Sequence, residues 1–154
     1  MAIEIERKYL VVTNAWRHNA IGTSYCQGYL SGNSETTVRV RTEGSNAFLT
    51  IKGRKQGISR PEFEYPIPFK EAQELQSLCR KPLVKKTRYH LLHDGMTWEV
   101  DEFHGENAGL IIAEIELDDP EATFALPPWV GKEISHDPRY FNSNLSVHPF
   151  STWS

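Results

Sequence analysis

Charged and apolar residues alternate in short segments along most of this chain. In residues 3–9, for example, the charged residues Glu4, Glu6 and Lys8 occupy every second position, starting directly after Ile3. Because successive side chains of a β-strand point to opposite faces, each such segment predicts a strand with one charged face. Gly, Asn, Ser, Pro and Asp-Gly positions separate the segments, which is typical of a mostly antiparallel sheet.

The alternation predicts eight strands. They cover residues 3–11, 24–30, 36–43, 47–53, 60–67, 84–92, 97–103 and 111–117. Eight antiparallel strands are enough to close a barrel.

Three helices are predicted between and after the strands. Residues 69–80 carry apolar side chains at roughly helical spacing, and 119–126 form a short candidate. A third helix should begin near Asp137, which can cap it, with Pro138 at the first helical position. We expect that helix to close the chain.

The charged faces of the predicted strands hold eight acids and six bases. The acids are Glu4, Glu6, Glu62, Glu64, Glu99, Asp101, Glu114 and Glu116, and the bases are Lys8, Arg39, Arg41, Lys52, Lys86 and Arg88. A solvated sheet face is the simpler explanation for any one strand. Such a face usually also carries Ser, Gln and Asn, whereas these faces are almost entirely charged. The set as a whole therefore predicts that the charged faces line the inside of the barrel.

An enclosed charged lumen implies a charged occupant. Removing an ion from water costs several kcal/mol unless partners or metals compensate for it. Six bases suit a polyanion, and clustered carboxylates supply the hard oxygen ligands that Mg²⁺ or Mn²⁺ prefers. The pattern thus predicts a site for a triphosphate together with divalent metal ions.

Seven short motifs along the chain carry a resemblance to a known family. They are EIERK at 4–8, QGY at 27–29, VRVR at 38–41, TIK at 50–52, KKTRY at 85–89, EVD at 99–101 and EIEL at 114–117. In this order they resemble the CYTH superfamily, also called triphosphate tunnel metalloenzymes, whose signature is ExExK. The resemblance implies an α+β fold: an eight-stranded antiparallel closed barrel with helices packed outside. It also implies that RYFNSNL at 139–145 is a C-terminal plug helix.

The resemblance also implies roles for the charged residues. It assigns triphosphate binding to Lys8, Arg39, Arg41, Lys52, Lys86 and Arg88. It assigns metal binding to Glu4, Glu6, Asp101, Glu114 and Glu116, with Glu62, Glu64 and Glu99 as supporting carboxylates. Lys8 and Lys86 are candidate catalytic residues, and Tyr29 resembles a proton acceptor. A tyrosine pKa near 10 makes Tyr29 a poor base at neutral pH, so a purely hydrogen-bonding role stays open.

Hydrolysis of inorganic tripolyphosphate is the function that the resemblance favours for a chain of 154 residues. A class IV adenylyl cyclase, a thiamine triphosphatase and a non-catalytic polyphosphate-binding or nucleotide-binding module are the alternatives. A purely structural barrel would need no matched lumen charges.

The remaining expectations concern the chain as a whole. Its length fits a single domain over residues 1–154. A net charge of −3 argues against nucleic acid as a partner, and no apolar run is long enough to span a membrane. Nothing resembles a secretory signal, so we expect a cytoplasmic protein, either a monomer or a homodimer. Arg54 and Lys55 are expected in a solvated turn.

Overall fold

The computed structural model describes residues 3–18, 20–33 and 35–153. The strands are β1 (Ile3–Val11), β2 (Gly22–Gly32), β3 (Thr37–Glu43), β4 (Asn46–Lys52), β5 (Ser59–Pro66), β6 (Val84–His93), β7 (Met96–Phe103), β8 (Ile111–Glu116) and β9 (Val130–Glu133). The α-helices are α1 (Phe69–Leu78) and α2 (Asn142–Leu145), and the 3₁₀ turns are η1 (Ala15–Arg17), η2 (Gly105–Asn107), η3 (Pro138–Tyr140) and η4 (Phe150–Thr152). All eight predicted strands are present, within about two residues at each end.

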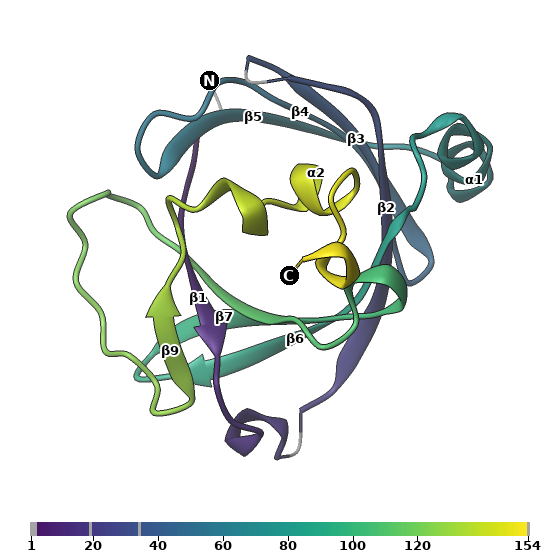
Figure 1. Cartoon of the computed structure of the whole chain (residues 1–154). Helices are drawn as coiled ribbons and strands as arrows, with labels where there is room; N and C mark the ends of the chain where they lie inside the picture. The colour runs from purple at the N-terminus through teal and green to yellow at the C-terminus, as the bar shows by residue number, and fades with distance from the viewer. Residues whose placement is uncertain (1–2, 19, 34, 154) are drawn as a thin grey trace.

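The strands form one antiparallel sheet that closes on itself. The described strands follow the order β5-β4-β3-β2-β6-β7-β8-β1-β9, and β5 also pairs with β1. The first half of β1 pairs with β5 through Ile3 to Ile5, and its second half pairs with β9 through Tyr9 and Val11. The predicted eight-stranded closed barrel is therefore confirmed, and β9 is an additional strand that the alternation did not predict (Figure 1).

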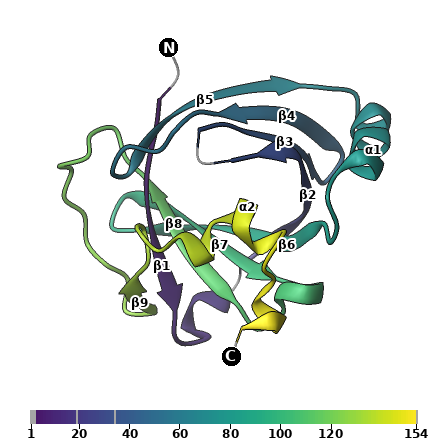
Figure 2. The same cartoon turned by 45° about the horizontal axis from the view of Figure 1, so that its top comes forward.

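The apolar faces of the strands lie outside the lumen and are mostly covered there, whereas Ile3 of β1 and Phe63 and Tyr65 of β5 stay exposed. Tyr9, Trp98, Val100 and Ile115 form a buried cluster on the β1, β7 and β8 side. Helix α1 packs against β2, β3 and β4 on the outer side of the barrel (Figure 2). Burial of these apolar side chains stabilises the barrel and leaves the alternate, charged positions to face inward.

The predicted helix over residues 119–126 is wrong. After a turn at 118–121 the chain runs without regular structure as far as Pro127. Phe124 packs from this loop against Trp98, with ring centroids 5.7 Å apart. Prolines at 127 and 128 restrict the preceding residues to extended conformations, and a helix this short gains little from its own hydrogen bonds. The loop covers the same apolar face that a helix would have covered.

The C-terminal segment, residues 137–153, lies across one mouth of the barrel, and we call it the plug (Figure 1). As predicted, Asp137 caps a helical turn, because its carboxylate accepts a hydrogen bond from the backbone N–H of Arg139 at 3.2 Å. The turn is η3 rather than a continuous helix, since Phe141 is extended, with φ −67° and ψ 136°. The predicted single plug helix is therefore replaced by η3, α2 and η4, of which η4 is the last.

Candidate active site

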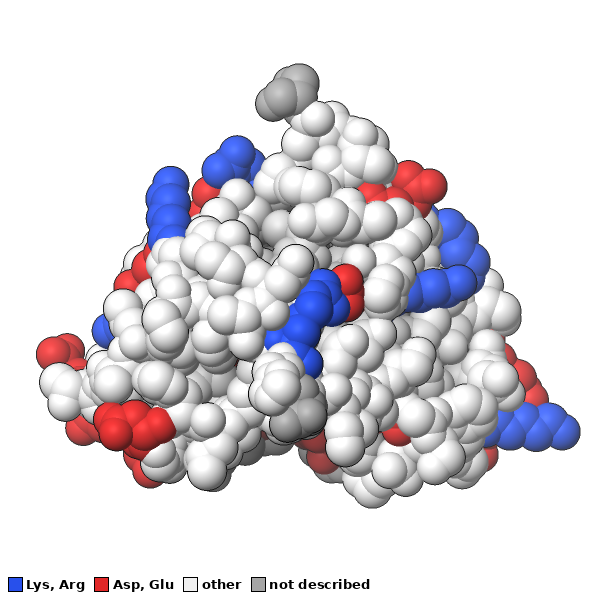
Figure 3. All heavy atoms as spheres, turned by 90° about the horizontal axis from the view of Figure 1, so that it is seen from below, with Lys and Arg blue, Asp and Glu red and all other residues white. Residues whose placement is uncertain are grey.

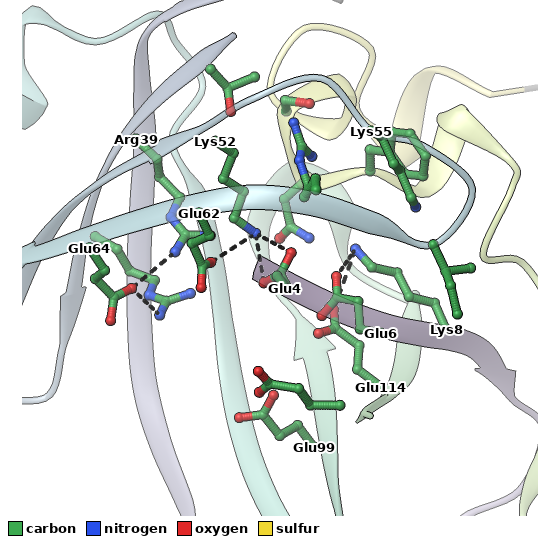
Figure 4. Close-up of a pocket in the computed structure, with 18 of the residues that line it drawn as sticks. Glu4, Glu6, Lys8, Arg39, Lys52, Lys55, Glu62, Glu64, Glu99 and Glu114 are labelled. Carbon is green, nitrogen blue, oxygen red and sulfur yellow. Dashed lines mark hydrogen bonds and ion pairs between the residues drawn. The ribbon is translucent and has the colours of Figure 1, made fainter. Parts of the chain in front are cut away.

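The barrel encloses a charged cavity of about 200 Å³. All six predicted bases line it, as do Tyr29 and every predicted carboxylate except Asp101. The alternation of side chains along each strand delivers these residues to the same face, as Figure 4 shows for the labelled ones. The prediction that the charges lie inside the barrel is therefore confirmed.

Lys8 on β1 lies among the carboxylates at the side of the cavity next to the plug. Its Nζ is 3.6 Å from a carboxylate oxygen of Glu6 and 3.6 Å from one of Glu114 on β8 (Figure 4). Burial alone would lower the pKa of Lys8, but Glu114 and Glu6 outweigh it and hold that pKa well above its ordinary value. Lys8 is therefore a fixed cation at any physiological pH.

Two arginines of β3 converge on one carboxylate across the sheet. One terminal nitrogen each of Arg39 and Arg41 lies 3.7 Å from Glu64 on β5, and Arg41 also pairs with Glu43 at 2.6 Å. Thr50, on the intervening strand β4, donates a hydrogen bond to Glu64 at 3.2 Å. Guanidinium groups aimed into a lumen in this way can each grip two oxygens of a phosphate group.

Lys52 on β4 joins the two carboxylates on either side of it. Its Nζ is 3.0 Å from Glu4 on β1 and 3.4 Å from Glu62 on β5. The three residues come together because β5 pairs with both β4 and β1 and so brings these strands to opposite sides of Glu62. The ion pairs set this lysine at the centre of the cavity wall (Figure 4).

Asp101 occupies a different place from the other predicted metal ligands. It is fully buried, and its carboxylate accepts hydrogen bonds from Lys86 Nζ at 2.8 Å and from Arg88 Nε and Nη2 at 2.7 and 2.8 Å. It does not line the cavity. Asp101 is thus the counter-ion that holds Lys86 and Arg88 from below, while those two bases face the lumen. Burial lowers the pKa of Lys86 to about 8 even though Asp101 opposes that shift.

Glu116 on β8 carries an uncompensated negative charge. Burial raises its pKa, and the neighbouring carboxylates of Glu4, Glu99, Glu6 and Glu62 raise it further. Among the residues that the structure describes, no Lys or Arg nitrogen lies within 4.0 Å of Glu116. This group of carboxylates therefore has more negative charge than the neighbouring lysines and arginines neutralise.

The oxygen-rich carboxylate group fits a hard divalent cation by its chemistry. In the described part of the chain, no three Asp, Glu, His or Cys side chains already converge as metal ligands do. The reason is visible in the ion pairs, because Glu4 and Glu6 turn toward Lys52 and Lys8. Binding a metal ion here would require these side chains to exchange an ammonium partner for the ion.

Tyr29 on β2 lines the cavity and is almost fully buried. Its hydroxyl accepts a long hydrogen bond, 3.4 Å, from the side-chain amide of Gln27. This contact is compatible with the structural role of Tyr29, and its role as a proton acceptor stays a prediction.

The plug supplies contacts that the strand pattern could not predict. The Asn142 side-chain oxygen accepts hydrogen bonds from Gln27 at 3.0 Å and from Lys86 at 3.1 Å. Asn142 therefore couples the plug to one of the predicted phosphate-binding lysines. Phe141 also lines the cavity, and Lys8 Nζ lies 5.7 Å from the centre of its ring.

The expectation of a solvated turn is wrong for Lys55. Lys55 lines the cavity, donates a hydrogen bond to the Ser135 carbonyl at 2.9 Å, and places its Nζ 4.3 Å from the centre of the Phe141 ring. Arg60 was also missed and lines the cavity. Arg60 has the same parity as Glu62 and Glu64 and could have been found from the alternation, whereas Lys55 lies in a loop without such a signal.

The outer surface differs from the lumen. On the face of the molecule seen in Figure 3, Lys and Arg are dispersed among Asp and Glu, with uncharged surface between them. The described atoms of this face therefore offer no continuous basic surface for nucleic-acid phosphates. No helix in the described ranges is both long and apolar enough to cross a membrane.

Comparison with known proteins defines the class to which this barrel belongs. The CYTH domain model matches residues 2–145, and this chain belongs to the CYTH domain family. It is similar to an inorganic triphosphatase of Acetivibrio thermocellus, with 49% identity over 99% of each chain. It is also similar to an inorganic triphosphatase of Nitrosomonas europaea, with 35% identity over 94% of this chain and 97% of the relative.

Solved structures give the same result. The crystal structure of the inorganic triphosphatase NE1496 matches with a TM-score of 0.70 and 34% identity, over 96% of each chain. The predicted family and fold are thereby confirmed.

Proposed function

We propose that this chain is a divalent-metal-dependent hydrolase that cleaves the terminal phosphoanhydride bond of inorganic triphosphate inside the barrel. The observation that carries the proposal is the lumen itself: eight bases and seven carboxylates line one cavity of about 200 Å³. Relatives named inorganic triphosphatase match nearly the whole chain, at 49% and 35% identity. Removing so many charged side chains from water costs free energy, and a charged ligand in the cavity would offset that cost.

In this proposal the bases bind and orient the triphosphate. Arg39, Arg41 and Arg88 provide planar forks for phosphate oxygens, while Lys8, Lys52 and Lys86 act as compact charges. Asp101, which lies outside the proposed ligand set, holds Lys86 and Arg88 in position before substrate arrives, so these two bases need little reorganisation when charge develops in the transition state.

The metal site that we propose consists of Glu4, Glu6, Glu114 and Glu116, with Glu62, Glu64 and Glu99 in support. The bound ions, Mg²⁺ or Mn²⁺, would neutralise the triphosphate and lower the pKa of an attacking water. Asp101 contributes to this site by fixing Lys86 and Arg88 and not as a ligand, since it lies outside the cavity.

The test is a substrate panel with metal-stripped protein. Tripolyphosphate, ATP and thiamine triphosphate are incubated with and without Mg²⁺ or Mn²⁺, and release of phosphate and of cyclic AMP is measured. The proposal predicts metal-dependent phosphate release, fastest from tripolyphosphate. Cyclic AMP from ATP would favour the cyclase, preference for thiamine triphosphate would favour that triphosphatase, and binding without turnover would favour a non-catalytic module.

We further propose that the protein works in the cytoplasm, as a monomer or homodimer. Size-exclusion chromatography with light scattering would distinguish the two oligomeric states.

A further inference from the structure

We call the charged cavity inside the barrel the tunnel. A second hollow, with basic side chains in its wall, adjoins the tunnel next to the plug. It has a volume of about 480 Å³ and is lined by Arg54, Lys55, Arg60 and Arg80, together with uncharged side chains of the plug and of the β2–β3 connection. We call it the vestibule. Four bases and no acid line it among the described residues, whereas the tunnel contains both signs.

Three of the four vestibule bases differ from the six bases on the tunnel strands in having no carboxylate within ion-pair distance. Each of the six tunnel bases lies within 4.0 Å of at least one carboxylate oxygen. Within the described ranges, no carboxylate oxygen lies that close to Lys55, Arg60 or Arg80, and Arg54 has only an exposed contact with Glu35 at 3.6 Å. The vestibule is therefore a cluster of cations without internal neutralisation.

The hydrogen bonds of these bases are made to neutral groups. Lys55 donates to the Ser135 carbonyl, and Arg60 donates from Nε and Nη2 to the Gly53 carbonyl at 3.1 and 2.8 Å. A carbonyl orients a cation without cancelling its charge. Burial and the nearby charges of Lys8 and Arg60 lower the pKa of Lys55 to about 8, although Glu6 and Glu4 oppose this shift.

The vestibule and the tunnel share a wall. Lys55, Arg60, Phe141, Ser143 and Thr37 line both hollows. Phe141 has Lys8 on the tunnel side, 5.7 Å from its ring centre, and Lys55 at 4.3 Å. An anion that leaves or extends beyond the tunnel at the plug would therefore meet Lys55 and Arg60, which line both hollows, before Arg54 and Arg80, which line only the vestibule.

We propose that the vestibule is a second phosphate-binding subsite, in which Lys55, Arg60 and Arg80 hold a phosphate group outside the tunnel. Charge-assisted hydrogen bonds from these groups suit phosphate oxygens. The phosphate group is either free orthophosphate or the outer unit of a chain longer than triphosphate. The choice of phosphate as the anion rests on the proposed function, whereas the uncompensated charge does not.

The test follows the side-chain Nε–Hε NMR signal of Arg80 in ¹⁵N-labelled, metal-stripped protein. Arg80 lies outside the tunnel lining, and Arg80→Gln identifies its signal. With the tunnel saturated by tripolyphosphate, orthophosphate is titrated in, and a saturable shift of the Arg80 signal is expected. In a parallel sample tetrapolyphosphate is added alone; a shift there that tripolyphosphate does not produce identifies the outer unit of a longer chain as the source.

Matched variants separate a subsite from a general charge effect. Arg80→Gln should weaken vestibule binding by about threefold to tenfold, as expected for one partly exposed charge-assisted contact, read from the shift of the Arg60 signal. Arg80→Lys, which keeps the charge, should restore part of the affinity. Lys70→Gln removes the same charge from the exposed face of α1 and should leave it unchanged.

Two results would overturn the subsite: no saturable Arg80 shift with either phosphate source, or equal weakening by Arg80→Gln and Lys70→Gln. Hydrolysis of tripolyphosphate, measured on the same protein preparation after Mg²⁺ or Mn²⁺ is added back, keeps the two proposals apart. Turnover without an Arg80 response contradicts the vestibule alone, and an Arg80 response without turnover contradicts the proposed function alone.

Discussion

The tunnel and the vestibule are neighbouring hollows that differ in how their basic side chains are neutralised. In the tunnel every predicted base has a carboxylate partner, and the most buried pair, Lys86 with Asp101, is almost wholly inaccessible, at 1% and 0% exposure. In the vestibule, bases contact carbonyl groups and an aromatic ring. Ion pairs can hold cations in fixed positions in a largely buried site, whereas cations without such partners are tolerated where water reaches them.

This difference suits the two regions to different functions. Rigid, paired charges suit a transition state, because their orientation is fixed before reaction. Unpaired and partly solvated charges suit reversible binding of an anion.

The largest effect is expected for Asp101→Asn. The substitution leaves Lys86 and Arg88 buried without their common counter-ion, so the free energy of unfolding should fall by about 3–5 kcal/mol. Denaturant unfolding of metal-free protein measures this change, and the exposed Asp118→Asn is the control. If Asp101→Asn instead kept its stability and lost only metal affinity, Asp101 would be a metal ligand after all.

Lys8→Ala and Glu114→Ala should keep the fold and lower turnover of tripolyphosphate by about a hundredfold or more, because each removes a preorganised charge from the lumen. Turnover at saturating substrate and metal, with circular dichroism as the check on folding, measures this effect. Lys70→Ala on the outer helix is the matched control. Wild-type turnover in either lumen variant would contradict its assigned role.

Glu116→Gln should raise the stability of the protein and weaken its metal binding, and both effects should be smaller than those above. It relieves repulsion among the carboxylates, so the melting temperature of metal-free protein should rise. The Mg²⁺ concentration for half-maximal turnover should also rise, by about tenfold or more, because a proposed metal ligand is lost and even groups behind the ligands cost about tenfold. Glu74→Gln on α1 should change neither quantity. A lowered melting temperature would mean that Glu116 has a cationic partner.

The smallest effect is a pH dependence that Lys55 contributes. Its folded pKa is about 8, below the ordinary value of 10.5, so between these values the unfolded chain holds a proton that the folded chain has lost. The contribution of Lys55 to the free energy of unfolding therefore rises with pH from about 8 to 10.5 and is constant below about 8. The charged groups that set this pKa are Lys8 and Arg60, which lower it, and Glu6 and Glu4, which raise it.

Lys55→Met removes this contribution. Between about pH 7.5 and 9.5, the free energy of unfolding should increase more in wild-type protein than in Lys55→Met. Lys86, whose pKa is also lowered to about 8, is present in both proteins and does not affect the difference. Equal changes in the two proteins would show that Lys55 keeps an ordinary pKa.

Much of the barrel and its lumen could be predicted from the sequence, because alternation along a strand fixes the face on which each side chain lies. Alternation says nothing about depth, so it grouped Asp101 with Glu99 although Asp101 lies beneath Lys86 and Arg88. It also does not reach loops, which is why Lys55 was misplaced. Strand β9 has four residues and depends on β1 for its pairing, so its own sequence carried little signal.

The plug shows the same limit for helices. Asp137 and Pro138 predicted the position of a helical turn correctly, because capping is a local property. How the chain continues after Phe141 depends on contacts across the barrel, such as those of Asn142 with Gln27 and Lys86. No local pattern encodes these contacts.

The central claim, that the lumen charges exist for catalysis, is tested most directly by Arg41→Ala, with tripolyphosphate turnover and thermal stability measured on the same sample. Burial and the nearby guanidinium groups of Arg39 and Arg88 lower the pKa of Arg41, although Glu43 opposes this shift. The account predicts a large loss of metal-dependent turnover in a protein that melts at or above the wild-type temperature. Wild-type turnover in a folded Arg41→Ala variant would contradict it.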